Sequence, residues 1–204
     1  MSDPIRDAAE AALRGEAIVI PTDTVYGIAT RPDDPAATSR LFAAKERPPD
    51  LELPVLVPST AAAREIASFD ERAAVLTQRF WAGPLTLVLP RTDASRPWDL
   101  GGDPRTIGVR MPHHTLALAV LARTGPLAVT SANRSGLPTP PTCDGVHAVF
   151  GDLVAVYLCD GAPLEGTAST VVDLAHGEPR VLRPGGIDEV ELLAVLAEAR
   201  TRAR

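Results

Sequence analysis

The sequence predicts a single α/β domain built around a mixed, twisted, open sheet flanked by helices. Short apolar runs rich in β-branched residues alternate with helical patterns along the whole chain. The alternation lacks strict β-α-β regularity, which favours a mixture of parallel and antiparallel strands. The chain has 204 residues, of which 45% are hydrophobic, so it is long enough for one good core. We therefore expect residues 1–204 to form one domain.

Start and stop signals define the first elements. Asp3-Pro4 offers an N-cap followed by proline at the first helical position, and Gly15 ends that helical pattern. A buried strand is predicted at 17–21, and it opens into the polar run Thr22-Asp23-Thr24. Asp34-Pro35 then starts a second helix by the same N-cap signal.

The remaining elements continue the alternation. Asp188 and Glu191 form a capping box for a last helix at 189–200. Other helices are predicted at 61–67, 71–81, 114–123 and 143–150, and strands at 53–57, 85–90, 106–111, 127–130, 154–159, 170–174 and 180–182.

Charge and cysteine usage limit the possible partners. A formal net charge of −6 argues against a surface that attracts nucleic acid everywhere, so any anion is expected to bind at a local site. Cys143 and Cys159 have neither C-x-x-C spacing nor the density of a disulfide framework, and we interpret them as reduced thiols. No apolar run approaches the roughly 20 residues that span a bilayer, and no apolar signal core is found. We expect a soluble, cytoplasmic protein with no membrane partner.

Several common site types find no support in the sequence. It contains no P-loop, no G-x-G-x-x-G, no H-E-x-x-H and no G-x-S-x-G motif. The four histidines lack ligand-like spacing with either cysteine, so no metal site built from side chains is predicted.

Lys45 is the only lysine among twenty basic residues, and it stands near the end of the second predicted helix, followed by Arg47 and two prolines. A lysine is a compact point charge that suits phosphate or carboxylate oxygens and is not equivalent to arginine. The alternative is a solvated lysine at a helix C-terminus, where a cation meets unpaired carbonyl groups. Lys45 and Arg47 are therefore candidate anion-binding residues.

Other polar clusters lie at strand ends, where α/β sheets usually bind ligands. Alternation along the strand at 106–111 places Thr106, Gly108 and Arg110 on one face, where a carboxylate or phosphate could bridge a hydroxyl and a cation. The alternatives are plain turns capped by their own backbone and an exposed strand face. The other clusters are 21–28, 130–136, 169–173 and 181–186.

Taken in order, these clusters resemble those of the YrdC/Sua5 family of threonylcarbamoyl-AMP synthases. The resemblance covers nearly the whole chain. It is carried by PTDTVYGI at 21–28, KERP at 45–48, FWAGPLTLVLP at 80–90, TIGVRMPHH at 106–114, TSANRSG at 130–136, STVVD at 169–173 and VLRPGG at 181–186.

The resemblance implies an open α/β fold with a large concave, locally positive cavity, and a reaction of L-threonine, bicarbonate or CO2, and ATP. The threonine amine is carboxylated, and a carbamate oxygen then attacks the α-phosphate, which gives threonylcarbamoyl-adenylate and pyrophosphate. Positioning and charge neutralisation can supply most of the rate in such a reaction, with Mg2+ expected on the ATP phosphates. The product serves N6-threonylcarbamoyladenosine formation in transfer RNA, so a downstream tRNA threonylcarbamoyl-transferase complex is an expected partner.

The resemblance also assigns roles to individual residues. Lys45 and Arg47 would be the catalytic residues that hold the ATP phosphates and the carbamate. Threonine and bicarbonate contacts fall on Thr24, Arg110, Ser131 and Ser169, and further ATP contacts on Thr106, Asn133, Thr142 and Arg183.

The sequence departs from the family pattern at three places. Leu51-Glu52-Leu53 follows the KERP motif where many members carry a polar residue. Pro141 occupies the place of a common hydroxyl, so the loop would have to shift to present Thr142. The additional C-terminal domain of the longer Sua5 type is not expected, and without it the sequence does not show which loop closes the site.

An RNA-binding or ribosome-maturation module of the same fold is the alternative function. The negative net charge and the scarcity of aromatic residues at the clusters weigh against it, because single-strand binders usually add stacking rings. Weak or no direct tRNA binding is therefore expected. Carbamoyl transfer, as in the related domain of hydrogenase maturation factors, is a third option that lacks the accompanying domains.

Overall fold

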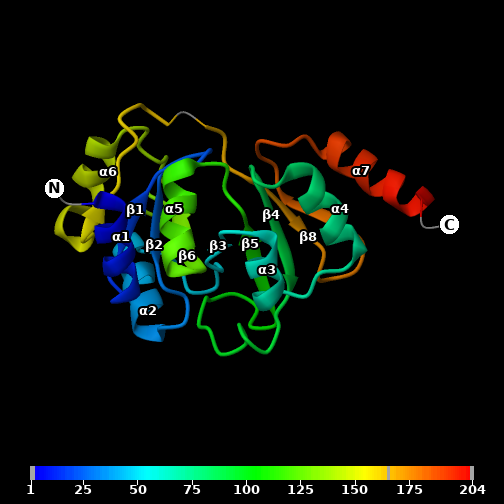
Figure 1. Cartoon of the computed structure of the whole chain (residues 1–204), viewed down its shortest axis with the longest axis horizontal. Coiled ribbons are helices and arrows are strands. Elements are labelled where there is room, and N and C mark those ends of the chain that lie inside the picture. Colours follow the sequence, from blue (N-terminus) through cyan, green and yellow to red (C-terminus); the bar gives the residue numbers. More distant parts are fainter. Residues whose placement is uncertain (1–2, 165, 203–204) are drawn as a thin grey trace.

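The computed structural model describes residues 3–164 and 166–202. Its centre is a nine-stranded mixed sheet with the strand order β7-β1-β2-β6-β3-β5-β4-β8-β9 (Figure 1). The β1/β7, β3/β5 and β4/β8 pairs are parallel, and the other pairs are antiparallel. The strands are β1 (Ile18–Ile20), β2 (Gly27–Thr30), β3 (Val55–Leu56), β4 (Leu85–Pro90), β5 (Thr106–Arg110), β6 (Leu127–Ser131), β7 (Val156–Tyr157), β8 (Thr170–Asp173) and β9 (Arg180–Arg183).

Seven α-helices and one short 3-10 helix lie among the described residues, and the helix starts follow the sequence signals. The Asp3 carboxylate accepts from the backbone N–H of Ile5, and Asp34 accepts from that of Ala36, as their N-cap positions require. The helices are α1 (Pro4–Leu13), α2 (Pro35–Lys45), α3 (Thr60–Ile66), α4 (Glu71–Phe80), α5 (Thr115–Thr124), α6 (Cys143–Phe150), η1 (Gly151–Leu153) and α7 (Glu189–Arg202).

The helices pack on the two faces of the sheet unequally. One core cluster joins the sheet to α2, α3, α4, α6 and α7, and the other lies between the sheet and α1 and α5. Figure 1 shows α1 and α6 at one end of the molecule and α4 and α7 at the other. The face that carries α1 and α5 therefore has fewer helices, and part of it is left for a cavity.

Strand alternation explains what that uncovered part presents. On β4, Leu85 and Leu87 belong to the larger core, so Thr86 between them points to the opposite face. On β5, Val109 likewise belongs to the larger core, and Arg110 points away from it. Polar side chains are therefore directed from the middle of the sheet to the less covered face.

One strand of the sheet was not predicted from the sequence. Residues 27–30, Gly-Ile-Ala-Thr, form β2 between β1 and β6 and are buried at every position. Burial on both faces removes the alternation that marks a half-buried strand, and glycine and alanine have low strand propensity. The Thr22-Asp23-Thr24 run is thus a tight connection between β1 and β2.

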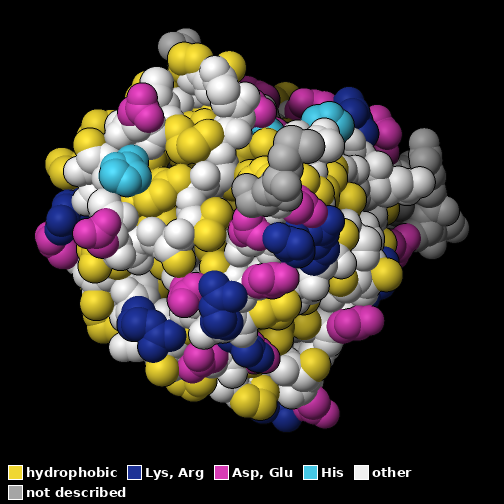
Figure 2. Space-filling view, turned by 60° about the vertical axis from the view of Figure 1, so that its left-hand side comes forward, with side chains coloured by type: hydrophobic (Ala, Val, Ile, Leu, Met, Phe, Trp, Pro, Cys, Tyr) yellow, Lys and Arg dark blue, Asp and Glu magenta, His cyan; other side chains and the backbone are white. Residues whose placement is uncertain are grey.

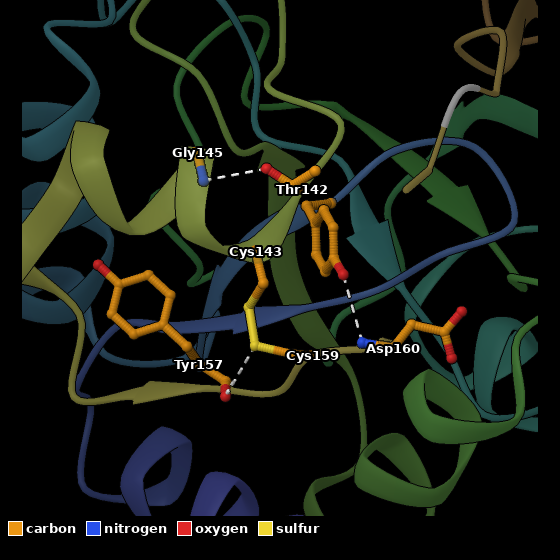
Figure 3. The surroundings of a disulfide bond; sticks show 7 residues. Thr142, Cys143, Gly145, Tyr157, Cys159 and Asp160 are labelled. Carbon is orange, nitrogen blue, oxygen red and sulfur yellow. Dashed lines mark hydrogen bonds between the residues drawn. A yellow bond between two sulfur atoms is a disulfide. The ribbon is translucent and has the colours of Figure 1, made fainter. Parts of the chain in front are cut away.

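The interpretation of Cys143 and Cys159 as reduced thiols is wrong for this structure. The two residues form a disulfide with a Cα–Cα distance of 5.6 Å, which joins the start of α6 to the segment after β7 (Figure 3). Their spacing of 16 residues resembles no metal or redox motif. The sequence gives no sign of the pairing, because only the fold brings the two segments together. In the chain-entropy account, a cross-link over a loop of this length stabilises a protein by about 3 kcal/mol.

No helix among the described residues combines the length and apolar character needed to cross a membrane.

Candidate functional site

A cavity of about 320 Å³ opens on the sheet face that carries α1 and α5. Leu56, which belongs to the core under those helices, forms part of its wall, as does the β4 residue Thr86. Seven of the residues predicted from the sequence line this one cavity: Thr24, Arg47, Arg110, Ser131, Asn133, Ser169 and Arg183. They come from loops and strand ends that are far apart in the sequence.

Lys45 supports the cavity wall from behind. It is the last residue of α2 and only 1% exposed, so the interpretation as a solvated lysine is wrong. Its Nζ donates to the backbone oxygens of Ser131 and Asn133 and lies 3.4 Å from Asn133 Oδ1. Burial, and secondarily the charge of Arg47, lower the pKa of Lys45 to about 7. Lys45 thus fixes the loop after β6 with an ammonium group that titrates near neutral pH.

Arg47 follows a sharp turn at the end of α2. Glu46 adopts the left-handed conformation with φ of 52°, which ends the helix and turns the chain. The Arg47 guanidinium donates to the backbone oxygens of Leu51 and Glu52 at 3.0 and 2.8 Å. Leu51 and Glu52, which depart from the family pattern, therefore still contact this site through their main-chain oxygens rather than through their side chains.

Arg110 ends β5 inside a dense set of contacts. Its guanidinium donates to Gly83 O at 3.1 Å, to Thr24 Oγ1 at 3.0 Å and to Asp23 Oδ1 at 2.6 Å. Burial lowers the pKa of Arg110, while Asp23 acts in the opposite direction. The residues on this strand face, Thr106 and Arg110, are buried, so the interpretation as an exposed strand face is wrong.

The β6 end and the loop after it form the wall above Lys45. Ser131 ends β6 and lines the cavity. The Asn133 side chain donates to the backbone oxygens of Arg134 and Leu137, so its amide holds the loop in a fixed turn. Together with Lys45, these bonds fix the position of the two polar side chains.

A chain of hydrogen bonds joins β4, β8 and β9 at the cavity. The hydroxyl groups of Thr86 and Ser169 are 2.9 Å apart. Arg183 donates to the Ser169 hydroxyl at 3.0 Å and to the Ser169 backbone oxygen at 2.8 Å. Since a guanidinium only donates, Ser169 accepts from Arg183, and its own proton is directed elsewhere.

Besides Lys45, which lies behind the wall, two of the predicted ATP contacts do not line the cavity. Thr106 begins β5, at the opposite end of the strand from Arg110, and its hydroxyl is 3.4 Å from Asp103 O. Thr142 is exposed at the N-cap of α6, where its hydroxyl accepts from the backbone N–H of Gly145 (Figure 3). The structure therefore separates these two hydroxyls from the other candidates.

Several side chains of the site were not predicted from the sequence. Thr22 and Thr86 line the cavity, and Asp23 pairs with Arg110. Asp23 stood within a recognised cluster, but nothing in the sequence links it to Arg110, because the two residues meet only in the fold. Thr86 carried only the weak signal of a polar residue within an apolar strand.

The cavity is positive within an acidic protein. Burial lowers the pKa of Arg47 and of Arg183, and Arg183 lowers the pKa of Arg47 further through like-charge repulsion. Such repulsion falls when an anion lies between the cations. On the outer face seen in Figure 2, by contrast, basic and acidic side chains lie beside one another. The site is therefore suited to a local anion.

Comparison with known proteins shows the family to which this chain belongs. The profile of the Sua5/YciO/YrdC proteins, a family described as telomere recombination, matches residues 10–185. A Mycobacterium leprae protein is 41% identical over 191 residues, which are 93% of this chain and 86% of the relative. The threonylcarbamoyl-AMP synthase of Bacillus subtilis is 38% identical over 96% of this chain, which corresponds to 57% of that protein.

Solved structures share the fold. Pyrococcus abyssi Sua5 complexed with L-threonine has a TM-score of 0.86 and 36% identity, over 95% of this chain and 57% of that one. Escherichia coli YciO has a TM-score of 0.81 and 25% identity, over 90% of both chains. The chain thus spans little more than half the length of the Sua5 protein and nearly all of YciO.

Proposed function

Because the chain belongs to the Sua5/YciO/YrdC family, we propose that it is an L-threonylcarbamoyladenylate synthase acting in the cytoplasm. The amine of L-threonine attacks CO2, or bicarbonate that loses water, and forms a carbamate with release of a proton. A carbamate oxygen then attacks the α-phosphorus of ATP, and the bond to the bridging oxygen of pyrophosphate breaks. The products are threonylcarbamoyl-AMP and pyrophosphate, as expected of a nucleotidyltransferase.

The observation that carries this proposal is the cavity shared by Arg47, Arg110 and Arg183 with several hydroxyl groups. The reaction needs no covalent enzyme nucleophile, and it brings together a carboxylate, a carbamate and a triphosphate. Cations and hydroxyls held by backbone and side-chain bonds can orient these groups and stabilise charge in the transition state.

Individual roles follow from the contacts of each residue. Arg110 and Thr24, which are already hydrogen-bonded to each other, would receive the threonine carboxylate. Arg47 and Arg183, whose bonds go to neutral oxygens, would hold ATP phosphates. Ser131, Ser169 and Asn133 would complete the two subsites, and Lys45 would act on ATP through the loop that it holds. Thr106 and Thr142 would reach ATP only after a rearrangement.

Mg2+ is proposed to enter with ATP. Among the described residues no group of three or more His, Cys, Asp or Glu is placed to hold a metal ion, so the phosphates would supply most of its ligands. A transferase that places the labile threonylcarbamoyl group on adenosine in tRNA is the proposed downstream partner, with weak or no direct tRNA binding by this chain.

Pyrophosphate release from ATP and bicarbonate, measured with each amino acid in turn, tests the proposal. Release should require L-threonine and should fall at least tenfold in Arg47→Met and Ser131→Ala. Arg31→Met is the control, because Arg31 pairs with the exposed Asp33 and does not line the cavity. Release that does not depend on threonine, from folded protein, would contradict the synthase assignment. A steep salt dependence of RNA binding would then favour the RNA-binding alternative.

A further inference from the structure

The cations of the cavity differ in their counter-charges. Arg110 is paired with Asp23, whose Oδ1 lies 2.6 Å from Arg110 Nη2. Both side chains are largely buried, with exposed fractions of 7% and 13%. In the hydrogen bonds of the described residues, Arg47 and Arg183 donate to backbone carbonyl and hydroxyl oxygens only. The site therefore has an ion-paired part at Arg110 and a part at Arg47 and Arg183 that has no hydrogen-bonded carboxylate in the described part of the chain. Asp50 acts on Arg47, and Arg183 acts on Arg110, through their charges alone.

The position of Asp23 is fixed independently of any ligand. The same Oδ1 that pairs with Arg110 accepts from the backbone N–H of His113 at 2.9 Å. Thr22 and Thr24, its neighbours in sequence, line the cavity and bond to each other through their hydroxyls at 2.9 Å. Asp23 is thus held in direct contact with the Arg110 guanidinium.

Arg110 nevertheless keeps donors for a ligand. A guanidinium has five N–H groups, and the bonds to Gly83, Thr24 and Asp23 use three of them. The remaining donors on Nη1 and Nη2 can bind a ligand carboxylate. The positive charge of Arg110 is already compensated by Asp23. A ligand with no net charge is therefore favoured over an anionic ligand.

We propose that Asp23 is a specificity-determining residue that makes the Arg110 subsite select a zwitterionic amino acid over an anion of the same shape. This inference rests on the proposed function, because it takes the amino acid to bind at Arg110. The carboxylate of the ligand binds the guanidinium, while its ammonium group, one carbon away, experiences the negative charge of Asp23. An anion of the same shape that lacks the ammonium group is repelled by Asp23 and gains no attraction to offset this repulsion. ATP, a polyanion, is directed to Arg47 and Arg183.

The test compares L-threonine with (R)-3-hydroxybutyrate, which has the same carboxylate and hydroxyl but no amine. Dissociation constants from ligand-observed NMR titration give a selectivity ratio for each variant. Asp23→Asn keeps an acceptor for Arg110 and His113 and removes the charge, so the ratio should fall about tenfold, and the dissociation constant of ATP should stay within twofold. Asp33→Asn, at the exposed pair with Arg31, should leave the ratio unchanged.

Asp23→Glu, which keeps the charge, separates charge from shape. The inference predicts a ratio within threefold of wild type for this variant, with melting temperatures recorded for all variants. An unchanged ratio in a folded Asp23→Asn protein, or an equal loss in Asp23→Glu and Asp23→Asn, would overturn the inference while leaving the synthase assignment intact. Wild-type protein that neither binds threonine nor releases pyrophosphate would instead overturn both.

Discussion

Lys45 and Arg110 are both buried cations, but the structure satisfies them differently. The Lys45 ammonium is surrounded by oxygens of neutral groups, and its pKa falls to about 7. The Arg110 guanidinium is paired with a carboxylate, and an arginine stays protonated in proteins. One side of the site therefore depends on a contact that responds to pH, whereas the other depends on a fixed ion pair.

Removal of the fixed cation should have the largest effect. Arg110→Met leaves the Asp23 carboxylate buried without its partner, which should lower the free energy of unfolding by about 3–5 kcal/mol. Urea denaturation measures this loss. Threonine binding should also fall below detection in a titration under native conditions.

The double variant Asp23→Asn/Arg110→Met separates the two consequences. With both charges gone, most of the stability should return, because no charge is left unpaired. Threonine binding should remain lost. A double variant as unstable as Arg110→Met would show that packing around Arg110, rather than the charge of Asp23, causes the instability.

Removal of the second cation should cost less stability. Lys45→Met takes the donor from the backbone oxygens of Ser131 and Asn133, and the expected loss is about 2 kcal/mol. Because the end of β6 and the loop after it then lose these bonds, pyrophosphate release should fall at least tenfold. Arg40→Met on the same helix removes a bond to Gly15 O, away from the cavity, and should leave the release within twofold of wild type.

Lys45 and Arg110 also show which features of the site can be predicted from the sequence. The strand and helix order followed from apolar periodicity and N-cap signals, and the motif order indicated the family. Lys45 was identified as unusual, but its partners are backbone oxygens of a distant loop, which no side-chain pattern reveals. The same limit applies to Asp23, since only the fold brings residues 23 and 110 together.

Long-range pairing also explains the remaining errors. The disulfide depends on α6 lying beside β7, and β2 is buried by strands on both of its sides. Thr106 and Thr142 belong to motifs of the right composition, yet the chain directs them away from the cavity. Composition and local spacing therefore predicted the segments that form the site. They did not predict which atoms of those segments are in contact.

The pH dependence of stability should distinguish the two cations further. The pKa of Lys45 is lowered in the folded state from 10.5 to about 7, so between these values the unfolded chain binds more protons. The Lys45 contribution to the free energy of unfolding should rise from pH 7 to pH 10, by up to about 1.4 kcal/mol per pH unit. Chemical denaturation of wild type and Lys45→Met across this range measures the difference. A pH-independent difference would contradict the lowered pKa.

The smallest effect is expected at Thr86, where the site depends on neutral groups. Thr86→Val keeps the shape but removes the hydroxyl that lies 2.9 Å from Ser169 Oγ. Arg183 still donates to Ser169, so only one of two restraints on that hydroxyl is lost. We expect the KM for threonine to rise about threefold, equivalent to about 0.6 kcal/mol. Thr86→Ser, which keeps the hydroxyl, should match wild type. If Thr86→Ser instead shows the same rise as Thr86→Val, the methyl group packed beside Gly108 contributes as much as the hydroxyl at this position.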